Sequence, residues 1–218
     1  VLRGAFQDGS LAGGLGESWA ILEGYTKMHA CCQHLHAAVE AVLDLQGAAT
    51  AKGLDSIAAI EVATHDLALP LQNANPHNTL SAKFSMAHAL AAALVTGEAG
   101  APAFASGTIG DARLDALRRK VVMSPWPGPV PAPPDDRPAS VRLRCADGAV
   151  LEATCHSARG GADRPFPPEA RLAKISGLTA AMYPRLGPMA EALAAASDGR
   201  RSAAWRDLVG EFINRGDL

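Results

Sequence analysis

The sequence has few aromatic residues, almost no net charge and no long apolar run. Its 218 residues include 20 Lys and Arg against 22 Asp and Glu, and only 5% of them are aromatic. Without clustered positive charge, the chain lacks the attraction by which proteins bind nucleic acids and anionic membranes. Its most apolar stretch, residues 87–95, is far shorter than the roughly 20 residues of a membrane-spanning helix. We therefore expect no nucleic-acid partner and no membrane partner.

A signal peptide and a disulfide framework are also missing. The first residues contain no basic region followed by an apolar run, so we expect a cytoplasmic location. In that compartment the four cysteines are expected to remain thiols. Hydrophobic residues make up 48% of the chain, which is enough to bury a core without disulfides. This composition excludes disordered and collagen-like proteins.

Apolar residues at helical spacing predict several helices. In the first, Leu35, Val39 and Val42 share one face, and the helix ends near Gly47. In the second, Phe84 belongs to the buried stripe and Gly97 closes the helix. The predicted helices cover residues 35–46, 79–96, 111–119, 169–183 and 205–213.

Four strands are predicted between these helices. The β-branched residues of Ile57–Thr64 indicate a half-buried strand, and Val121–Met123 indicates another. Residues 141–145 and 150–156 alternate apolar and polar side chains on either side of Asp147-Gly148. This pattern predicts a hairpin, because glycine readily adopts the positive φ of a tight turn. The elements together predict an α+β fold, with a small antiparallel sheet, accompanying helices and helical flanks.

Side chains that can carry out chemistry gather in residues 27–36. The segment contains Lys27, Gln33, three of the seven histidines and two of the four cysteines. A helix that starts here would attract an anion such as a carboxylate, through its free N–H groups and partial positive charge. Two other interpretations stay open: a zinc site that uses Cys32 and His36 with His29 or His34, and a purely structural helix start.

Three stretches of the sequence carry motifs that occur together in one protein family. In the first, residues 27–45, a lysine, a cysteine and a histidine precede a helix with AxxA spacing. The second, residues 78–91, is similar to an AxFSxxYxxA helix, and the third, residues 141–174, contains a strand, an Asp-Gly turn, a second strand, Gly-Gly and Arg-Pro-Phe-Pro. In this order the stretches resemble the MmgE/PrpD family, which includes 2-methylcitrate dehydratase, cis-aconitate decarboxylase and iminodisuccinate epimerase.

The resemblance implies that the chain is the C-terminal half of a longer protein. Family members have a large helical domain, built from the N-terminal part and the C-terminal tail, around a smaller α+β domain. On this basis residues 1–26 are the end of the helical domain, residues 27–168 form the α+β domain, and residues 169–218 return to the helical domain. The implied protein partners are the N-terminal helical domain, in cis or in trans, and a second copy in a homodimer.

The resemblance also implies a lyase that needs no cofactor and no metal. Such a dehydratase or decarboxylase would act on a small di- or tricarboxylate, for example 2-methylcitrate or cis-aconitate. By position, Lys27 and His36 are site residues, and His88 stands where relatives often have tyrosine. We expect Lys27 to stabilise negative charge on the substrate, while His36 or His88 transfers a proton next to a carboxylate.

The remaining expected site residues bind the substrate; they are His29, Cys32, Gln33, Lys83 and Ser85. One alternative is an epimerase or isomerase of the same fold, which removes the proton but expels no group. Another is a catalytically silent half that pairs with a separate large-domain chain.

Overall fold

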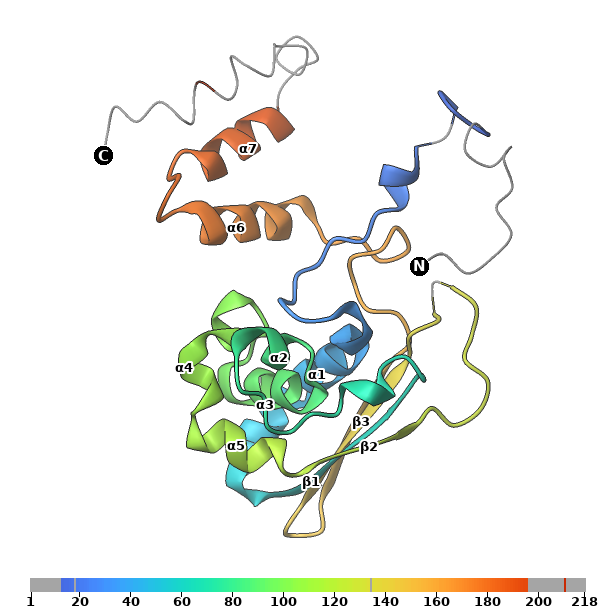
Figure 1. Cartoon of the computed structure of the whole chain (residues 1–218), viewed down its shortest axis with the longest axis vertical. Coiled ribbons are helices and arrows are strands. Elements are labelled where there is room, and N and C mark those ends of the chain that lie inside the picture. Colours follow the sequence, from blue (N-terminus) through green and yellow to red (C-terminus); the bar gives the residue numbers. More distant parts are fainter. Residues whose placement is uncertain (1–12, 18, 134, 196–209, 211–218) are drawn as a thin grey trace. The chain divides into compact units, whose positions relative to one another are not determined.

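The computed structural model describes residues 13–17, 19–133, 135–195 and 210 (Figure 1). The chain divides into two compact units, residues 1–165 and residues 166–218, each of which is described by itself. Within the described part of the chain, no helix is both long and apolar enough to cross a membrane. The four cysteines are free thiols.

The first unit is built on a four-stranded sheet in the order β2-β1-β3-β4. Its strands are β1 (Ile57–Thr64), β2 (Val121–Pro125), β3 (Ala139–Cys145) and β4 (Val150–Cys155). The predicted hairpin is confirmed as β3–β4, and Gly148 in its turn has a φ of 82°. The predicted α+β class is confirmed as well.

The sheet is mixed, which departs from the antiparallel sheet that we expected. β3 pairs antiparallel with both β1 and β4, but β2 runs parallel to β1. Parallel neighbours need a long crossover connection, usually one that contains helices. Residues 65–120, between β1 and β2, provide such a connection because they contain helices α2 to α5.

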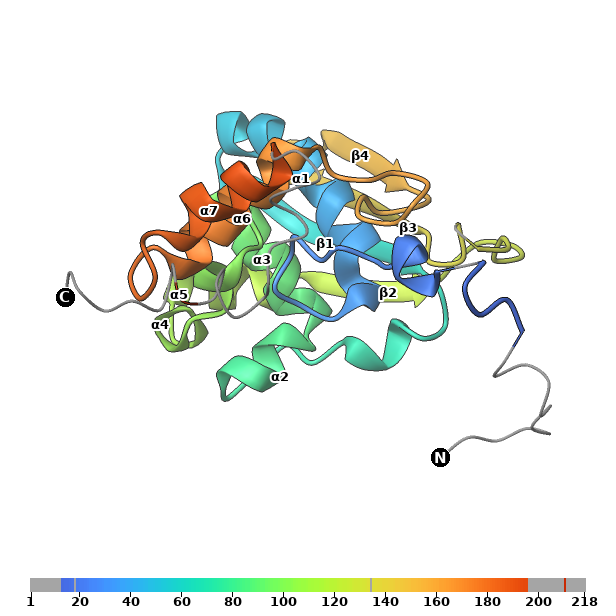
Figure 2. The ribbon, with the colours of Figure 1, turned by 90° about the horizontal axis from the view of Figure 1, so that it is seen from above.

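Two helices cover one face of this sheet. α1 (His36–Lys52) packs against β3 and β4 and also against α3 (Met86–Thr96), as Figures 1 and 2 show. Apolar side chains from both helices and the sheet are fully buried between them. The core includes Leu35, Val39, Val42, Ile60, Leu90, Leu94 and Leu143. On the opposite face of the sheet, Arg142 and Arg144 pair with Glu61 and Glu152 across the strands.

The contact between α1 and α3 is rich in alanine. All residues from 36 to 42 of α1 and from 86 to 94 of α3 are buried. The separation of packed helices depends on the side chains at their contact, and alanine permits a close approach. The N-terminal end of α1 is therefore held firmly against the rest of the unit.

Two of the predicted helices have different bounds in the structure. The first continues past Gly47 to Lys52 and ends at Gly53, which has a φ of 83°. The second is interrupted and forms α2 (Thr79–Lys83) and α3, because Ser85 caps a new helix. Phe84 lies at this interruption and is 48% exposed, so its predicted place in the core is wrong. Gly97 closes α3 in the left-handed conformation, as predicted.

Short elements complete the first unit. α4 (Ser106–Ile109) precedes α5 (Ala112–Arg118), whose predicted N-cap Asp111 accepts from the backbone N–H groups of Arg113 and Leu114. Short 3₁₀ helices join the larger elements: η2 (Ala20–Glu23), η3 (Gln33–Leu35), η4 (Leu54–Ser56), η5 (Leu69–Leu71) and η6 (Ala101–Phe104).

The second unit contains α6 (Pro168–Thr179) and α7 (Leu186–Ala194), which pack against each other. Gly187 allows this contact, since a Cβ at that position would collide with the Ser176 hydroxyl. The helix predicted at residues 205–213 lies outside the described residues, apart from residue 210.

Candidate functional site

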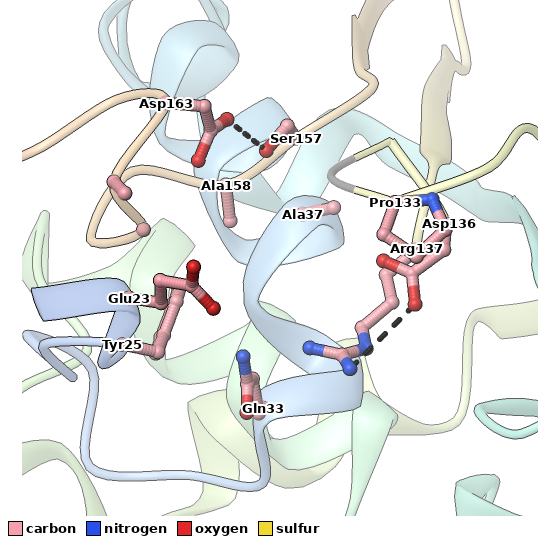
Figure 3. Close-up of a pocket in the computed structure, with 12 residues that line it drawn as sticks. Glu23, Tyr25, Gln33, Ala37, Pro133, Asp136, Arg137, Ser157, Ala158 and Asp163 are labelled. Carbon is pink, nitrogen blue, oxygen red and sulfur yellow. Dashed lines mark hydrogen bonds and ion pairs between the residues drawn. The ribbon is translucent and has the colours of Figure 1, made fainter. Parts of the chain in front are cut away.

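A pocket of about 770 Å³ lies at the N-terminal end of α1 (Figure 3). Three segments that are far apart in the sequence form its walls: residues 23–37, 133–137 and 157–163. Backbone hydrogen bonds tie two of them together, since the Thr26 N–H donates to the Gly160 carbonyl at 2.7 Å. The fold thus assembles the pocket from the entry to α1 and the loops that flank the β3–β4 hairpin.

Tyr25, which lines the pocket, is hydrogen-bonded to a histidine behind it. The Tyr25 hydroxyl lies 2.9 Å from Nδ1 of His36, and Nε2 of His36 lies 3.3 Å from the Cys31 carbonyl oxygen. Because a carbonyl oxygen only accepts, Nε2 carries the proton, and in the neutral ring Nδ1 then accepts from the Tyr25 hydroxyl. His36 is 1% exposed, and the half-buried Tyr25 is the member that lines the pocket.

A buried carboxylate lies close to this pair. Glu40 follows His36 by four residues on α1, so the two side chains lie on the same helix face. Its Oε1 accepts the Arg159 backbone N–H at 2.8 Å and lies 4.0 Å from Nε2 of His29. The His29 ring meets the His36 ring edge to face, with centroids 5.1 Å apart. Burial, together with the negative charge of Glu40, raises the pKa of Tyr25 above its ordinary value.

The rest of the pocket lining is charged. Three carboxylates, those of Glu23, Asp136 and Asp163, accompany one guanidinium, that of Arg137. Arg137 pairs with Asp136 at 3.6 Å, across the pocket from Glu23 and Tyr25 in Figure 3. Asp163 accepts a hydrogen bond of 2.8 Å from the Ser157 hydroxyl. The pocket therefore offers acidic groups as well as a cation to a ligand.

Of the eight predicted site residues, Gln33 alone lines this pocket directly. His36 reaches it through Tyr25, and His29 packs behind His36. Lys27 is exposed, two residues after Tyr25. Burial raises the pKa of Cys31 to about 12, and the nearby charge of Lys27 opposes that rise.

Cys32 connects two segments that both contain predicted site residues. Its backbone N–H donates to the Lys83 carbonyl oxygen at 2.8 Å, which joins the segment before α1 to the segment before α3. Ser85 is buried; its hydroxyl donates to the Asn73 carbonyl oxygen and accepts the His88 backbone N–H at 2.9 Å. The side chain of Ser85 thus acts as a helix cap in this structure.

The ring of His88 forms its hydrogen bonds with other residues than the ring of His36 does. It is fully buried, with Nε2 3.1 Å from the Ala103 carbonyl oxygen and Nδ1 3.3 Å from Nη1 of Arg118. The carbonyl oxygen only accepts and the guanidinium only donates, so His88 is neutral with its proton on Nε2. Burial is the main reason why the pKa of His88 is lowered, and the charge of Arg118 lowers it further.

Residues 29–196, more than half of the chain, match the model of the MmgE/PrpD C-terminal domain. The chain belongs to the MmgE/PrpD family. The resemblance inferred from the three sequence stretches is thereby confirmed, including its restriction to the family's C-terminal half. No curated protein matches the chain.

The predicted zinc alternative finds no matching geometry in this MmgE/PrpD domain. Among the residues that the structure describes, no group of three or more His, Cys, Asp or Glu side chains is arranged to hold a metal ion. Cys31, one of the two adjacent cysteines, is 2% exposed and packs in the hydrophobic core.

Sequence reasoning missed three residues in or beside this pocket. Tyr25 carried a weak signal, because it is one of only two tyrosines and precedes Lys27 by two positions. Glu40 carried a clearer one, since it is an acidic residue within the apolar face that begins at Leu35. Arg137 lies in a proline-rich stretch, and nothing in its local sequence indicates that the stretch folds over the start of α1.

Proposed function

We propose that this chain forms the small-domain half of a lyase site for a di- or tricarboxylate such as 2-methylcitrate or cis-aconitate. The observation that carries this proposal is the pair of Tyr25 and His36 at the wall of a pocket that also contains a guanidinium, in a domain of the MmgE/PrpD family. The reaction is dehydration or decarboxylation, begun or ended by proton transfer next to a carboxylate.

The proposed chemistry requires both a proton acceptor and fixed cations. A C–H group next to a carboxylate is a very weak acid, so the growing charge on the carboxylate oxygens must be stabilised. Arg137 supplies one cation within the pocket, and Lys27 supplies a second from the exposed segment beside Tyr25. Neutral His36 supplies the final proton acceptor.

The other predicted residues take different parts in this proposal. Gln33 can donate its amide N–H to a substrate carboxylate from the pocket wall. His29, Cys32 and Lys83 surround the site without lining the pocket, and we keep them as predicted substrate contacts. His88 and Ser85 support the fold of α3, because each side chain already has its hydrogen-bond partners within the unit.

The N-terminal helical domain, in cis or in trans, completes the proposed site. The test is to supply that domain, add 2-methylcitrate, and follow the absorbance of the enoate that dehydration forms. New absorbance from 2-methylcitrate supports a dehydratase, and CO₂ released from cis-aconitate, which is itself an enoate, supports a decarboxylase. The absence of both signals contradicts the lyase. The intact mass of the native protein shows whether the helical domain belongs to the same polypeptide.

Lys27→Ala gives a sharper test of the proposed site. The side chain is exposed, so we expect an unchanged melting temperature and a loss of turnover. Lys52→Ala is the matched control, because Lys52 lies at the other end of α1, roughly 24 Å along the helix. Turnover in Lys27→Ala equal to that of Lys52→Ala would refute the role of Lys27.

A second candidate function, epimerisation, is favoured by the acidic lining. Three carboxylates beside one guanidinium suit a ligand that carries a protonated amine as well as carboxylates. Iminodisuccinate has this chemistry. Loss of its optical rotation, with no enoate absorbance from 2-methylcitrate, would favour the epimerase over the lyase. A catalytically silent half would produce neither signal even when the helical domain is present.

A further inference from the structure

We propose that Tyr25 is a catalytic residue, whose hydroxyl oxygen takes the ligand's proton while its own proton passes to Nδ1 of His36. This inference rests on the proposed function, because proton removal next to a carboxylate begins both dehydration and epimerisation. The residue lies outside the three stretches that led to the family, and it extends the expected set of Lys27, His36 and His88.

Burial decides which member of the pair meets the ligand. His36 is 1% exposed, and its two ring nitrogens are engaged by the Tyr25 hydroxyl and the Cys31 carbonyl oxygen. Tyr25 is half-buried and lines the pocket. The proposal places the ligand against the phenol oxygen, from which a proton can reach the imidazole through the hydrogen bond of 2.9 Å.

The direction of that hydrogen bond suits a base. When His36 is neutral with its proton on Nε2, the Tyr25 hydroxyl donates to Nδ1, and the lone pairs of its oxygen remain available to accept from a ligand. A phenol alone is a poor base, but proton transfer to His36 in the same step removes this obstacle. Through this pair, the buried imidazole can act as the base for a ligand in the pocket.

The atoms and electrons of the step balance without a redox partner. The ligand's C–H bond breaks and its electron pair stays on the ligand as a carboxylate-stabilised carbanion. A new O–H bond forms on Tyr25 as the former hydroxyl proton bonds to Nδ1. The products are a neutral phenol, an imidazolium on His36 and the ligand anion, and the reverse transfer returns the proton.

The surroundings offer opposite charges to both products. Glu40, on the same helix face as His36, is buried, and its carboxylate lies 4.0 Å from His29, whose ring packs on the His36 ring, and 3.5 Å from Nε of Arg159. A buried carboxylate interacts strongly with an imidazolium, because the local dielectric is low. Arg137, at the opposite wall, faces the ligand anion. Glu40 is therefore a positioning residue that stabilises the imidazolium through space.

The composition of the chain makes this proposal easy to test, since Tyr25 and Tyr183 are its only tyrosines. The assay is exchange of the methine proton of 2-methylcitrate in D₂O, followed by proton NMR with the helical domain supplied. We expect Tyr25→Phe to slow exchange by about 100-fold or more, within the usual range for a lost acid–base group. Tyr183→Phe, in the second unit, is the matched control and should exchange at the wild-type rate.

His36→Asn separates proton acceptance from hydrogen bonding. The amide oxygen of asparagine can accept from Tyr25 near the position of Nδ1, but it does not bind the proton at neutral pH. We expect this variant to be as slow as Tyr25→Phe, and the double variant to be no slower, because the two groups act as one unit. A double variant that multiplies the two losses would contradict the relay.

If Tyr25→Phe does not fold, a fluorinated tyrosine at position 25 provides a second test. Incorporated into Tyr183→Phe, 3-fluorotyrosine marks Tyr25 alone and makes its phenol more acidic with little change of shape. We expect the exchange rate to change with this acidity. An unchanged rate, or a Tyr25→Phe effect on KM with kcat retained, would overturn the proposal.

The two possible failures can be told apart. Wild-type exchange in Tyr25→Phe overturns the role of Tyr25 and leaves the proposed function standing. If the wild-type protein neither exchanges nor dehydrates 2-methylcitrate, and leaves iminodisuccinate unchanged, the proposed function fails and the role of Tyr25 fails with it.

Discussion

Replacing His88 by alanine should destabilise the first unit strongly. The variant removes the donor to the Ala103 carbonyl oxygen and the acceptor for Nη1 of Arg118, and it leaves a cavity against Phe104. A buried polar group without its partner costs about 1–3 kcal/mol, which applies to Nη1 of Arg118, whereas the Ala103 carbonyl oxygen keeps a hydrogen bond of 3.2 Å from the Thr108 hydroxyl. With the cavity included, we expect the free energy of unfolding to fall by about 3–5 kcal/mol.

Urea unfolding measures this loss directly, because a lower midpoint at an unchanged slope reports a change in stability alone. His88→Asn retains an acceptor near Nδ1 for Arg118, so its midpoint should lie between those of the wild type and His88→Ala. His77→Ala is the surface control, since His77 is exposed, and should shift stability by no more than about 0.5 kcal/mol. Wild-type stability in His88→Ala, combined with lost turnover, would refute the structural role and restore the catalytic one expected from the sequence.

Two further predictions follow from buried titratable groups. Burial lowers the pKa values of His34, His65 and His88 below their ordinary value of 6.5. As the pH falls, the unfolded chain therefore binds protons at a higher pH than the folded chain does. Urea midpoints should therefore be highest above pH 6.5 and should fall towards pH 5, and a constant midpoint would contradict the burial of these rings. Burial also raises the pKa of Cys31 to about 12 and that of Cys155 to about 11, so neither forms much thiolate at pH 8. Mass spectrometry after thiol labelling should find both slow to react in the native protein, and rapid labelling of either would refute this.

Most elements could be predicted from local patterns, because their physical causes are local. The alternation around Asp147-Gly148 fixed the β3–β4 hairpin, and the cap Asp111 fixed the start of α5. The direction of β2 was not predictable in this way, since it depends on how residues 65–120 cross the sheet. The interruption at Phe84 was also missed, because a continuous apolar stripe conceals the cap that Ser85 provides to α3.

The candidate site was predictable only in part, for a similar reason. The family motif pointed to Lys27 and His36 at the start of α1, and the structure places His36 behind Tyr25, which lines a pocket. The place of Arg137 in the pocket depends on the meeting of segments more than 100 residues apart, and that of Tyr25 on a hydrogen bond to a residue 11 positions away, and no helical or strand spacing encodes either.

The alanine-rich contact between α1 and α3 restricts how this domain can diverge. Alanine is already the smallest side chain that favours a helix, so nearly every substitution there adds volume. Added volume would push the two helices apart and shift the start of α1, which carries His36. Substitutions at those positions are thus coupled to the position of His36, including those at alanines that do not line the pocket.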